Sequence, residues 1–284
     1  EKMVEKKLGK GTYKSFFEVA DTVDNCPPSI LPTKDWRSLI FGDLDELEIA
    51  RQLTIGEHHI YAEIQPIELQ DLAWSKDKLK FRAPNVLAMI ERFNKYSTIF
   101  ATLLVGEPRI KDRRRLIERF VRIGEHLLEM NSFNMLMAIM SGFGNSAVYR
   151  MKHTFASLPR KTLDTMETFQ ALLSSNGSYK MYRDRLANVT PPIIPFLGVY
   201  LTDLTFANDG NPGELRGLTN FRKLQLEYDI IDQVLRFQKA AAYNFKMIPR
   251  MVSFLEALPK LDEQSLYSMS LQHEPRNVKK KDLK

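Results

Sequence analysis

The sequence predicts an all-α fold, and two observations carry this prediction. Between Trp36 and Arg276, nearly every segment places apolar residues three or four positions apart, which is the spacing of an amphipathic helix. No segment shows a convincing alternation of apolar and polar residues, which a half-buried strand would need. No internal repeat stands out, so we expect roughly ten helices packed side by side in a single large domain.

The helical pattern can be followed in chain order. Thr54 and Glu57 fit a capping box, with Thr54 as the N-cap and Glu57 reaching back to it. Wide apolar faces then predict helices over three ranges: 86–104, 112–139 and 163–173. The second of these is long enough to be a central helix, and the third is expected to stop near Asn176 and Gly177.

Three parts of the chain differ in composition. Residues 1–35 lack clean periodicity and contain several glycines and prolines, which predicts a linker or a packed extension. Residues 36–276 form the predicted domain. Residues 277–284 are rich in lysine and resemble a solvated basic tail.

The composition of the 284 residues is that of a soluble globular protein, with 44% hydrophobic and 27% charged residues. Cys26 is the only cysteine, so no intrachain disulfide can form and a reducing compartment is expected. The net charge of +6 is small and scattered, which argues against nucleic acid as a partner.

Membrane insertion is not expected from the sequence. The most apolar stretch, 193–206, is short and contains Asp203, so it does not predict a transmembrane helix. The charged start of the chain does not resemble a signal peptide. We therefore expect a cytoplasmic protein.

Sequence signals for covalent or metal chemistry are weak. The five histidines show no metal-ligand spacing, and no Gly-x-Ser-x-Gly elbow is present. Residues 142–147 loosely match a dinucleotide fingerprint, but they follow a predicted helix and therefore indicate a turn between helices. Residues 111–115 form a basic run that we interpret as a solvated helix start. These patterns favour a binding module, without metal or cofactor, over an enzyme of covalent chemistry.

A series of short blocks, taken in order, points to a family. The blocks are 48–57, 64–69, 83–86, 91–94, 130–142, 195–206, 210–211, 219–223 and 270–276. Their order and spacing resemble the catalytic domain of Ras-family guanine-nucleotide exchange factors of the Son-of-Sevenless type. The resemblance covers about residues 36–276. It implies an all-α domain that binds a small GTPase and ejects its nucleotide, without a cofactor of its own.

The resemblance also implies a protruding helical hairpin that levers open the first switch of the GTPase. The sequence is compatible with one. A first helix over 196–208 can begin after Pro195 and end at 210–212, where Gly, Asn and Pro follow one another. A second helix is predicted to pack through a seam of apolar residues, namely Phe221, Leu224, Tyr228, Ile231 and Leu235.

Three residues of the first hairpin helix are the candidate catalytic residues. Thr202, Thr205 and Asp209 are spaced at i, i+3 and i+7 and form a polar stripe beside an apolar stripe of leucines. By resemblance, Asp209 occupies the position where the family usually has a glutamate near the magnesium and phosphate region. Thr205 occupies the position of a leucine that shields the magnesium site.

Six further residues match family positions that contact the GTPase. Phe196 and Tyr179 match aromatic residues that contact the second switch, and Ile90 matches an apolar wall of the same pocket. The remaining three are expected to make polar contacts: Asn131, Glu91 and Asn211.

The sequence thus predicts an exchange factor for a Ras-subfamily GTPase, Ras or Rap, that is recruited to membranes peripherally. Thr205 and Asp209 depart from the family pattern, and they keep open the alternative of an inactive adaptor that binds a GTPase without exchanging its nucleotide. A nucleotide-dependent enzyme that uses residues 142–147 is a third hypothesis, and it requires a strand before Gly142.

Overall fold

The computed structural model describes residues 26–240 and 242–278, and it confirms the all-α prediction. Thirteen α-helices lie within these ranges. The first seven are α2 (Glu46–Ala62), α3 (Pro66–Leu69), α4 (Pro84–Gly106), α5 (Ile110–Glu129), α6 (Phe133–Gly144), α7 (Ser146–Tyr149) and α8 (Lys152–Phe155). The other six are α9 (Arg160–Leu172), α10 (Asn176–Asn188), α11 (Leu197–Gly210), α12 (Phe221–Arg236), α13 (Pro249–Glu256) and α14 (Glu263–His273).

The described residues also contain three short 3₁₀ helices and one two-stranded ladder between α11 and α12. The 3₁₀ helices are η2 (Phe41–Asp43), η3 (Gln70–Leu72) and η4 (Lys80–Arg82). The strands β1 (Glu214–Leu215) and β2 (Leu218–Thr219) are antiparallel, with Leu215 opposite Leu218. Arg216 and Gly217 between them both have positive φ, as a two-residue hairpin turn requires. The sequence did not predict this ladder.

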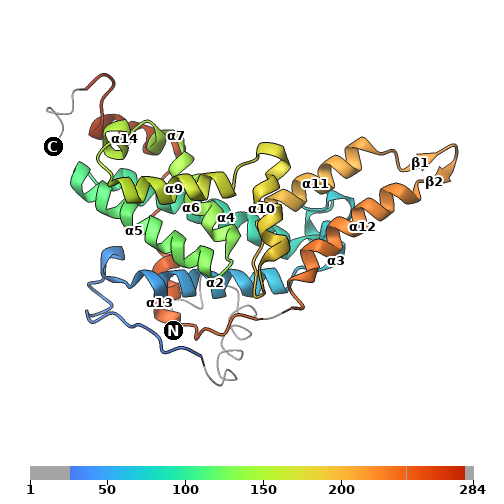
Figure 1. Ribbon diagram of the computed structural model, residues 1–284, viewed down its shortest axis with the longest axis horizontal. Helices are drawn as coiled ribbons and strands as arrows, with labels where there is room; N and C mark the ends of the chain where they lie inside the picture. Colours follow the sequence, from blue (N-terminus) through green and yellow to red (C-terminus); the bar gives the residue numbers. More distant parts are fainter. Residues whose placement is uncertain (1–25, 241, 279–284) are drawn as a thin grey trace.

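The core lies where α4 packs along α6 and α2 along α5. At its centre the buried ring of Phe120 on α5 contacts three other rings, with centroid distances of 5.7 Å to Phe41, 5.0 Å to Phe100 and 6.2 Å to Phe143. Figure 1 shows this body of helices with α11 and α12 projecting from it as a long arm, at the tip of which lie β1 and β2. The body therefore acts as a support for the arm.

Two helix boundaries differ from the predictions. The N-cap of α2 is Asp45, whose carboxylate accepts a hydrogen bond from the Glu48 backbone N–H at 3.0 Å. The predicted cap residues Thr54 and Glu57 are instead buried in the middle of α2. The predicted helix over 112–139 is interrupted after α5, because Asn131 adopts a left-handed conformation with a φ of 55° before α6 begins.

The basic run at 111–115 also differs in part from its interpretation as a solvated helix start. Lys111, Arg114 and Arg115 are exposed, but Arg113 is completely buried. The Arg113 guanidinium donates to Thr154 Oγ1 at 2.8 Å and lies 3.3 Å from Glu274 Oε1 at the end of α14. One residue of the run is thus part of the core.

The helices of the hairpin agree with the predictions, but their packing agrees only at the base. Leu197, Leu201 and Leu204 of α11 are buried, as expected for an anchoring stripe. Ile231 on α12 is buried as well, but Phe221, Leu224 and Tyr228 are exposed, so the predicted seam does not extend to the tip. The outer half of α12 reaches beyond the body and packs only beside α11, to which Lys223 donates at the Asn208 carbonyl.

The segments on either side of the predicted domain are described in part. The segment before Trp36 contacts α2, because Arg51 donates to the Pro28 carbonyl and the Ile30 N–H donates to Glu48 Oε2 at 2.9 Å. Residues 1–25 of the predicted extension and 279–284 of the predicted tail lie outside the described residues. Across the described ranges, no helix is both long enough and apolar enough to cross a bilayer.

Candidate functional site

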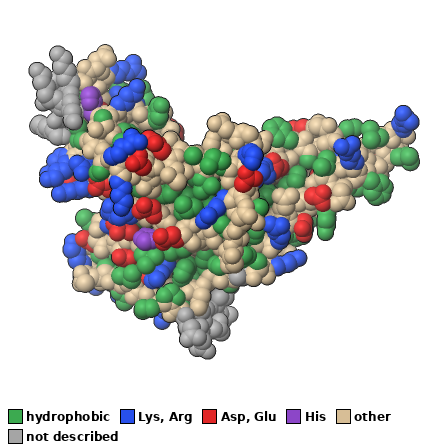
Figure 2. All heavy atoms as spheres, in the orientation of Figure 1, with side chains coloured by type: hydrophobic (Ala, Val, Ile, Leu, Met, Phe, Trp, Pro, Cys, Tyr) green, Lys and Arg blue, Asp and Glu red, His purple; other side chains and the backbone are tan. Residues whose placement is uncertain are grey.

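The arm formed by α11 and α12 projects from the body and carries several of the predicted site residues. Its inner residues anchor it to the body, while its outer part presents large apolar side chains to solvent (Figure 2). These exposed side chains are Phe206, Leu215, Leu218, Phe221, Leu224, Leu226 and Tyr228. Exposed apolar groups in such a concentration mark a surface that contacts another macromolecule.

The predicted catalytic residues lie along one edge of α11. Thr202 and Asp209 are exposed, and Thr205 is half-buried. Both threonine hydroxyls donate to carbonyls one turn earlier, Thr202 to Gly198 at 2.8 Å and Thr205 to Leu201 at 2.9 Å. The Asp209 carboxylate accepts from Asn208 Nδ2 at 3.0 Å and otherwise faces solvent. The stripe can therefore offer one negative charge at the outer end of α11.

Aromatic rings gather at the other end of α11. Phe196 is the N-cap residue of this helix, and its ring centroid lies 5.6 Å from that of Phe93 and 6.2 Å from that of Tyr179. The ring also covers Gly198, where a Cβ atom would lie only 2.5 Å from the Phe196 Cζ, so a glycine is needed for this packing. All three rings are only partly buried, which leaves apolar surface open to a partner.

The neighbours of this aromatic cluster come from α4 and α10. Ile90 precedes Phe93 on α4 and is partly buried, while Glu91 beside it is exposed. Tyr179 lies in the first turn of α10, where Gly177, Ser178 and Tyr179 all have a φ near 60°. Left-handed backbone is costly for residues other than glycine, and such strain concentrates at functional sites.

Asn131 and Asn211 use their side-chain amides within the fold. Asn131 Nδ2 donates to the carbonyl of Thr190 at 3.1 Å and to that of Pro192 at 3.3 Å, which holds the segment leading to α11. Asn211 Nδ2 donates to the Ala207 carbonyl at 2.9 Å and satisfies the end of the same helix. Each asparagine thus positions α11. The amide oxygen of Asn131 is left for a contact with a partner, as are the amide oxygen and one N–H of Asn211.

The predicted residues form an extended surface and not a single pocket. Phe196 and Asp209 stand at opposite ends of α11, about 20 Å apart at 1.5 Å per residue. The exposed edge of α11 connects them. A surface of this length suits a folded protein as partner better than a small molecule.

Sequence reasoning missed the polar contacts that fix the base of the arm. Asn134 Oδ1 accepts from the Leu197 N–H at 3.3 Å, and the Tyr182 hydroxyl accepts from the Phe196 N–H at 2.6 Å. Arg183 on α10 forms an ion pair with Asp203 on α11, in which Nη2 lies 2.9 and 2.8 Å from the two carboxylate oxygens. Asn134 and Tyr182 are buried polar residues in otherwise apolar helix faces, and this was the only signal available in the sequence.

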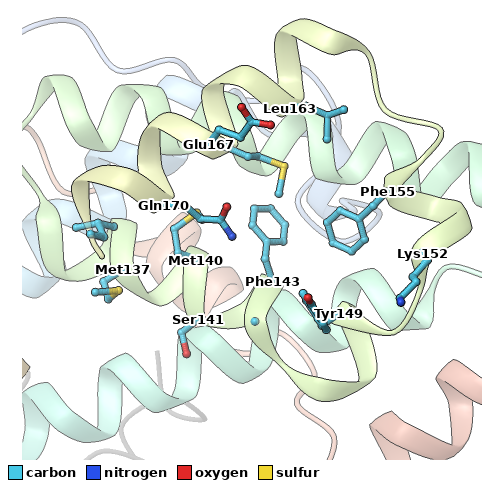
Figure 3. A pocket seen from close by; sticks show the side chains of 13 residues that line it. Met137, Met140, Ser141, Phe143, Tyr149, Lys152, Phe155, Leu163, Glu167 and Gln170 are labelled. Carbon is cyan, nitrogen blue, oxygen red and sulfur yellow. The ribbon is translucent and has the colours of Figure 1, made fainter. Parts of the chain in front are cut away.

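A separate apolar cavity of about 750 Å³ opens between α6, α8 and α9. Met140, Phe143, Phe155 and Leu163 point toward its interior, as Figure 3 shows, and Lys152 lies at its edge. None of the predicted site residues lines it. The cavity therefore does not belong to the surface on the arm.

The structure does not support the third hypothesis, a nucleotide-dependent enzyme. Residues 142–144 are the last residues of the helix α6, the element that leads into them is that helix and not a strand, and α7 begins at Ser146. Only Asn145 therefore forms the predicted turn between helices. In the part of the chain that the structure describes, no three His, Cys, Asp or Glu side chains are arranged to hold a metal ion.

Comparison with known proteins identifies the family of this chain. Residues 48–225 match the RasGEF domain. Three relatives from Dictyostelium discoideum are similar over most of this chain: Ras guanine nucleotide exchange factor J (41% identity over 90% of the chain), factor I (39% over 99%) and factor A (40% over 99%). The chain spans 32%, 34% and 48% of the lengths of these relatives, respectively. Because the matched region exceeds half of its length, the chain belongs to the RasGEF domain family.

Proposed function

We propose that this domain accelerates GDP release from a Ras-subfamily GTPase, Ras or Rap. Membership of the RasGEF family and the names of the relatives support this function. The observation that carries it is the arm itself, which offers an aromatic cluster at its base and a polar stripe with one acid, Asp209, toward its tip. Because the GTPase would be attached to a membrane, the domain would be recruited there peripherally.

In the proposed mechanism, the two ends of α11 have different tasks. Phe196 and Tyr179 hold the second switch of the GTPase, with Ile90 as a wall and Glu91 as a polar contact. The hairpin displaces the first switch, and Asn211 contacts it at the end of α11. Catalysis follows if the domain binds the nucleotide-free GTPase more tightly than the loaded form, because only such differential binding accelerates release.

Asp209 acts through its charge in this mechanism. A carboxylate close to the phosphate site opposes the return of the negatively charged nucleotide, since like charges repel. Thr202 and Thr205 lie on the same edge, and their hydroxyls are already engaged with the helix, so they contribute shape more than hydrogen bonding. The hairpin therefore acts mainly by steric displacement, and its acid adds to that effect.

Competition with nucleotide tests the proposed function directly. The domain should form a stable complex with Ras or Rap only after nucleotide is removed, and excess GDP or GTP should dissociate it, because two ligands that weaken each other do so reciprocally. Gel filtration with and without GDP measures this. Survival of the complex in excess GDP would favour the inactive adaptor. Release of a fluorescent nucleotide from Ras, Rap and Ral proteins then identifies the substrate.

Substitution of the acid should have a modest effect. We expect Asp209→Asn to lower the exchange rate about two- to fivefold, because one exposed charge contributes little energy but acts at the phosphate site. Complex formation with the nucleotide-free GTPase should persist. Asp164→Asn, which changes an exposed acid on α9, serves as the matched control and should be silent. Equal rates for wild type and Asp209→Asn would remove the acid from the mechanism.

A further inference from the structure

A buried asparagine connects the base of the arm to a buried carboxyl group. The Asn134 side chain, in the first turn of α6, donates through Nδ2 to Glu57 Oε1 at 2.7 Å. Its amide oxygen accepts from the Leu197 N–H, the first residue of α11, at 3.3 Å. Asn134 and Glu57 are both almost completely inaccessible to solvent. Three helices, α2, α6 and α11, thus meet through one side-chain amide.

The Glu57 carboxyl group lies where negative charge helps two helix N-termini. The backbone of Met135, in the first turn of α6, favours the charged form of Glu57, and Asn134 links the carboxyl group to the first N–H of α11. Helix N-termini carry partial positive charge, so a carboxylate there is favourable. A charge-assisted hydrogen bond is also stronger than a neutral one and polarises the next bond in the chain.

The surroundings of Glu57 bring its titration into the physiological range. Burial raises the pKa of Glu57 to about 7, against the opposing effects of the Arg92 charge, the hydrogen bond from Asn134 and the Met135 backbone. Glu57 Oε2 has no hydrogen-bond partner.

The other titratable groups near Glu57 are fixed. Arg92 on α4 is paired with Glu256 on α13 at 2.7 Å. Tyr96 on α4 and Tyr243, between α12 and α13, also face Glu57, and burial raises the pKa of both hydroxyls, so they stay neutral near pH 7. The His58 ring lies 5.3 Å from that of Tyr243, and burial lowers the pKa of His58 to about 4, so it is neutral as well. Among these groups, Glu57 is the one whose charge changes near pH 7.

We infer that Asn134 is a positioning residue for the α11–α12 arm, and that Glu57 behind it makes the placement of the arm depend on pH. The tests below that measure nucleotide exchange rest on the proposed function, whereas those that measure the domain alone do not. When Glu57 is charged, the Asn134 bridge is strong and the start of α11 is held firmly. When Glu57 is protonated, both helix N-termini lose the charge and the bridge weakens.

The variant Glu57→Gln separates the charge from the contact. Its carboxamide oxygen can still accept from Asn134, but it does not titrate. We expect the exchange activity of wild type, divided by that of Glu57→Gln, to fall about three- to tenfold between pH 8 and pH 6, as one charge-assisted bond becomes neutral. The ratio cancels any pH dependence of the GTPase itself. A ratio that is constant from pH 6 to pH 8 would overturn the inference.

A second comparison separates positioning from general loss of packing. Ser141, also on α6, forms a side-chain hydrogen bond with Ser97 at 2.9 Å and does not contact the arm. Ser141→Ala should leave the exchange activity and its pH profile unchanged. Asn134→Leu should reduce exchange. If this variant is folded, its exchange activity divided by that of Glu57→Gln should not change between pH 8 and pH 6. If Ser141→Ala lowered the exchange activity as much as Asn134→Leu, the effect of Asn134 would be one of core packing and not of positioning the arm.

Two measurements on the domain alone decide the inference even if the proposed function fails. Amide hydrogen exchange over 197–200, relative to Glu57→Gln at the same pH, should lose protection about three- to tenfold from pH 8 to pH 6. Because folding raises the Glu57 pKa from its ordinary 4.5, the folded state holds the proton more tightly. The free energy of unfolding of the whole domain should therefore fall as pH rises from about 4.5 to about 7 in wild type and not in Glu57→Gln. This change is opposite in sign to the change in protection at 197–200, because that protection reports local opening at the start of α11 and not global unfolding. Unchanged protection would contradict the bridge, whereas absent exchange activity contradicts only the proposed function.

Discussion

Phe196→Ala is expected to lower nucleotide exchange at least about tenfold while the domain stays folded. Removal of an aromatic anchor that packs against a partner typically costs more than the 1.4 kcal/mol that correspond to this factor. The Phe196 ring is only half-buried between Phe93 and Tyr179, so the fold does not depend on it alone. The backbone N–H of residue 196 keeps its bond to Tyr182. Release of a fluorescent nucleotide from the GTPase measures the rate.

The matched control for this variant is Phe155→Ala. Phe155 is also partly buried, but it lines the cavity between α6, α8 and α9, away from the arm. It should lose a comparable amount of stability and keep its exchange rate. Circular dichroism confirms that both variants are folded. If folded Phe196→Ala exchanges nucleotide at a near-normal rate, the aromatic cluster does not hold the GTPase.

The sequence pattern predicted helices well where residues within the helix itself determine its extent. The apolar spacing over 86–104 corresponds to α4, and the predicted ends of the hairpin lie within two residues of those of α11 and α12. These helices carry a continuous apolar stripe and clear end signals. Both are properties of a short segment and can be read without knowledge of its neighbours.

The predictions of helix ends and of burial failed where contacts with residues distant in the sequence determine them. Thr54 and Glu57 match a capping box in sequence, but α2 has already begun at Glu46, and both side chains point into the core. The break at Asn131 is fixed by its bonds to carbonyls some 60 residues away. Burial along α12 ends where the body ends, and amphipathic spacing contains no information on where that is.

The candidate site was accessible from sequence only through its resemblance to a family. Thr202, Thr205 and Asp209 form a polar stripe that helical spacing alone would assign to a solvated face. The Asn134 bridge was not accessible in either way, because Glu57, Asn134 and Leu197 are far apart in the sequence. Such a contact requires the packing of three helices to be known.

Glu274, at the end of α14, is the centre of a buried polar cluster near the predicted C-terminal boundary. Its carboxylate accepts from the backbone N–H groups of His153 at 3.1 Å and Thr154 at 3.0 Å, and it pairs with the buried Arg113. Arg150 donates to the Glu274 carbonyl at 2.7 Å. The RasGEF match ends at residue 225, so these contacts bear on the predicted boundary at 276.

Glu274→Ala is expected to lower the free energy of unfolding by about 3–5 kcal/mol, because removal of one partner leaves the Arg113 charge buried and unpaired. Burial already lowers the pKa of the Arg113 guanidinium, which shows how poorly its charge is solvated there. Urea denaturation measures the change. Glu263→Ala, an exposed acid on the same helix that contacts Asn145, should stay within about 0.5 kcal/mol of wild type. Equal stabilities of the two variants would place α14 outside the cooperative unit. A large difference would extend that unit to the predicted boundary, well beyond the matched region.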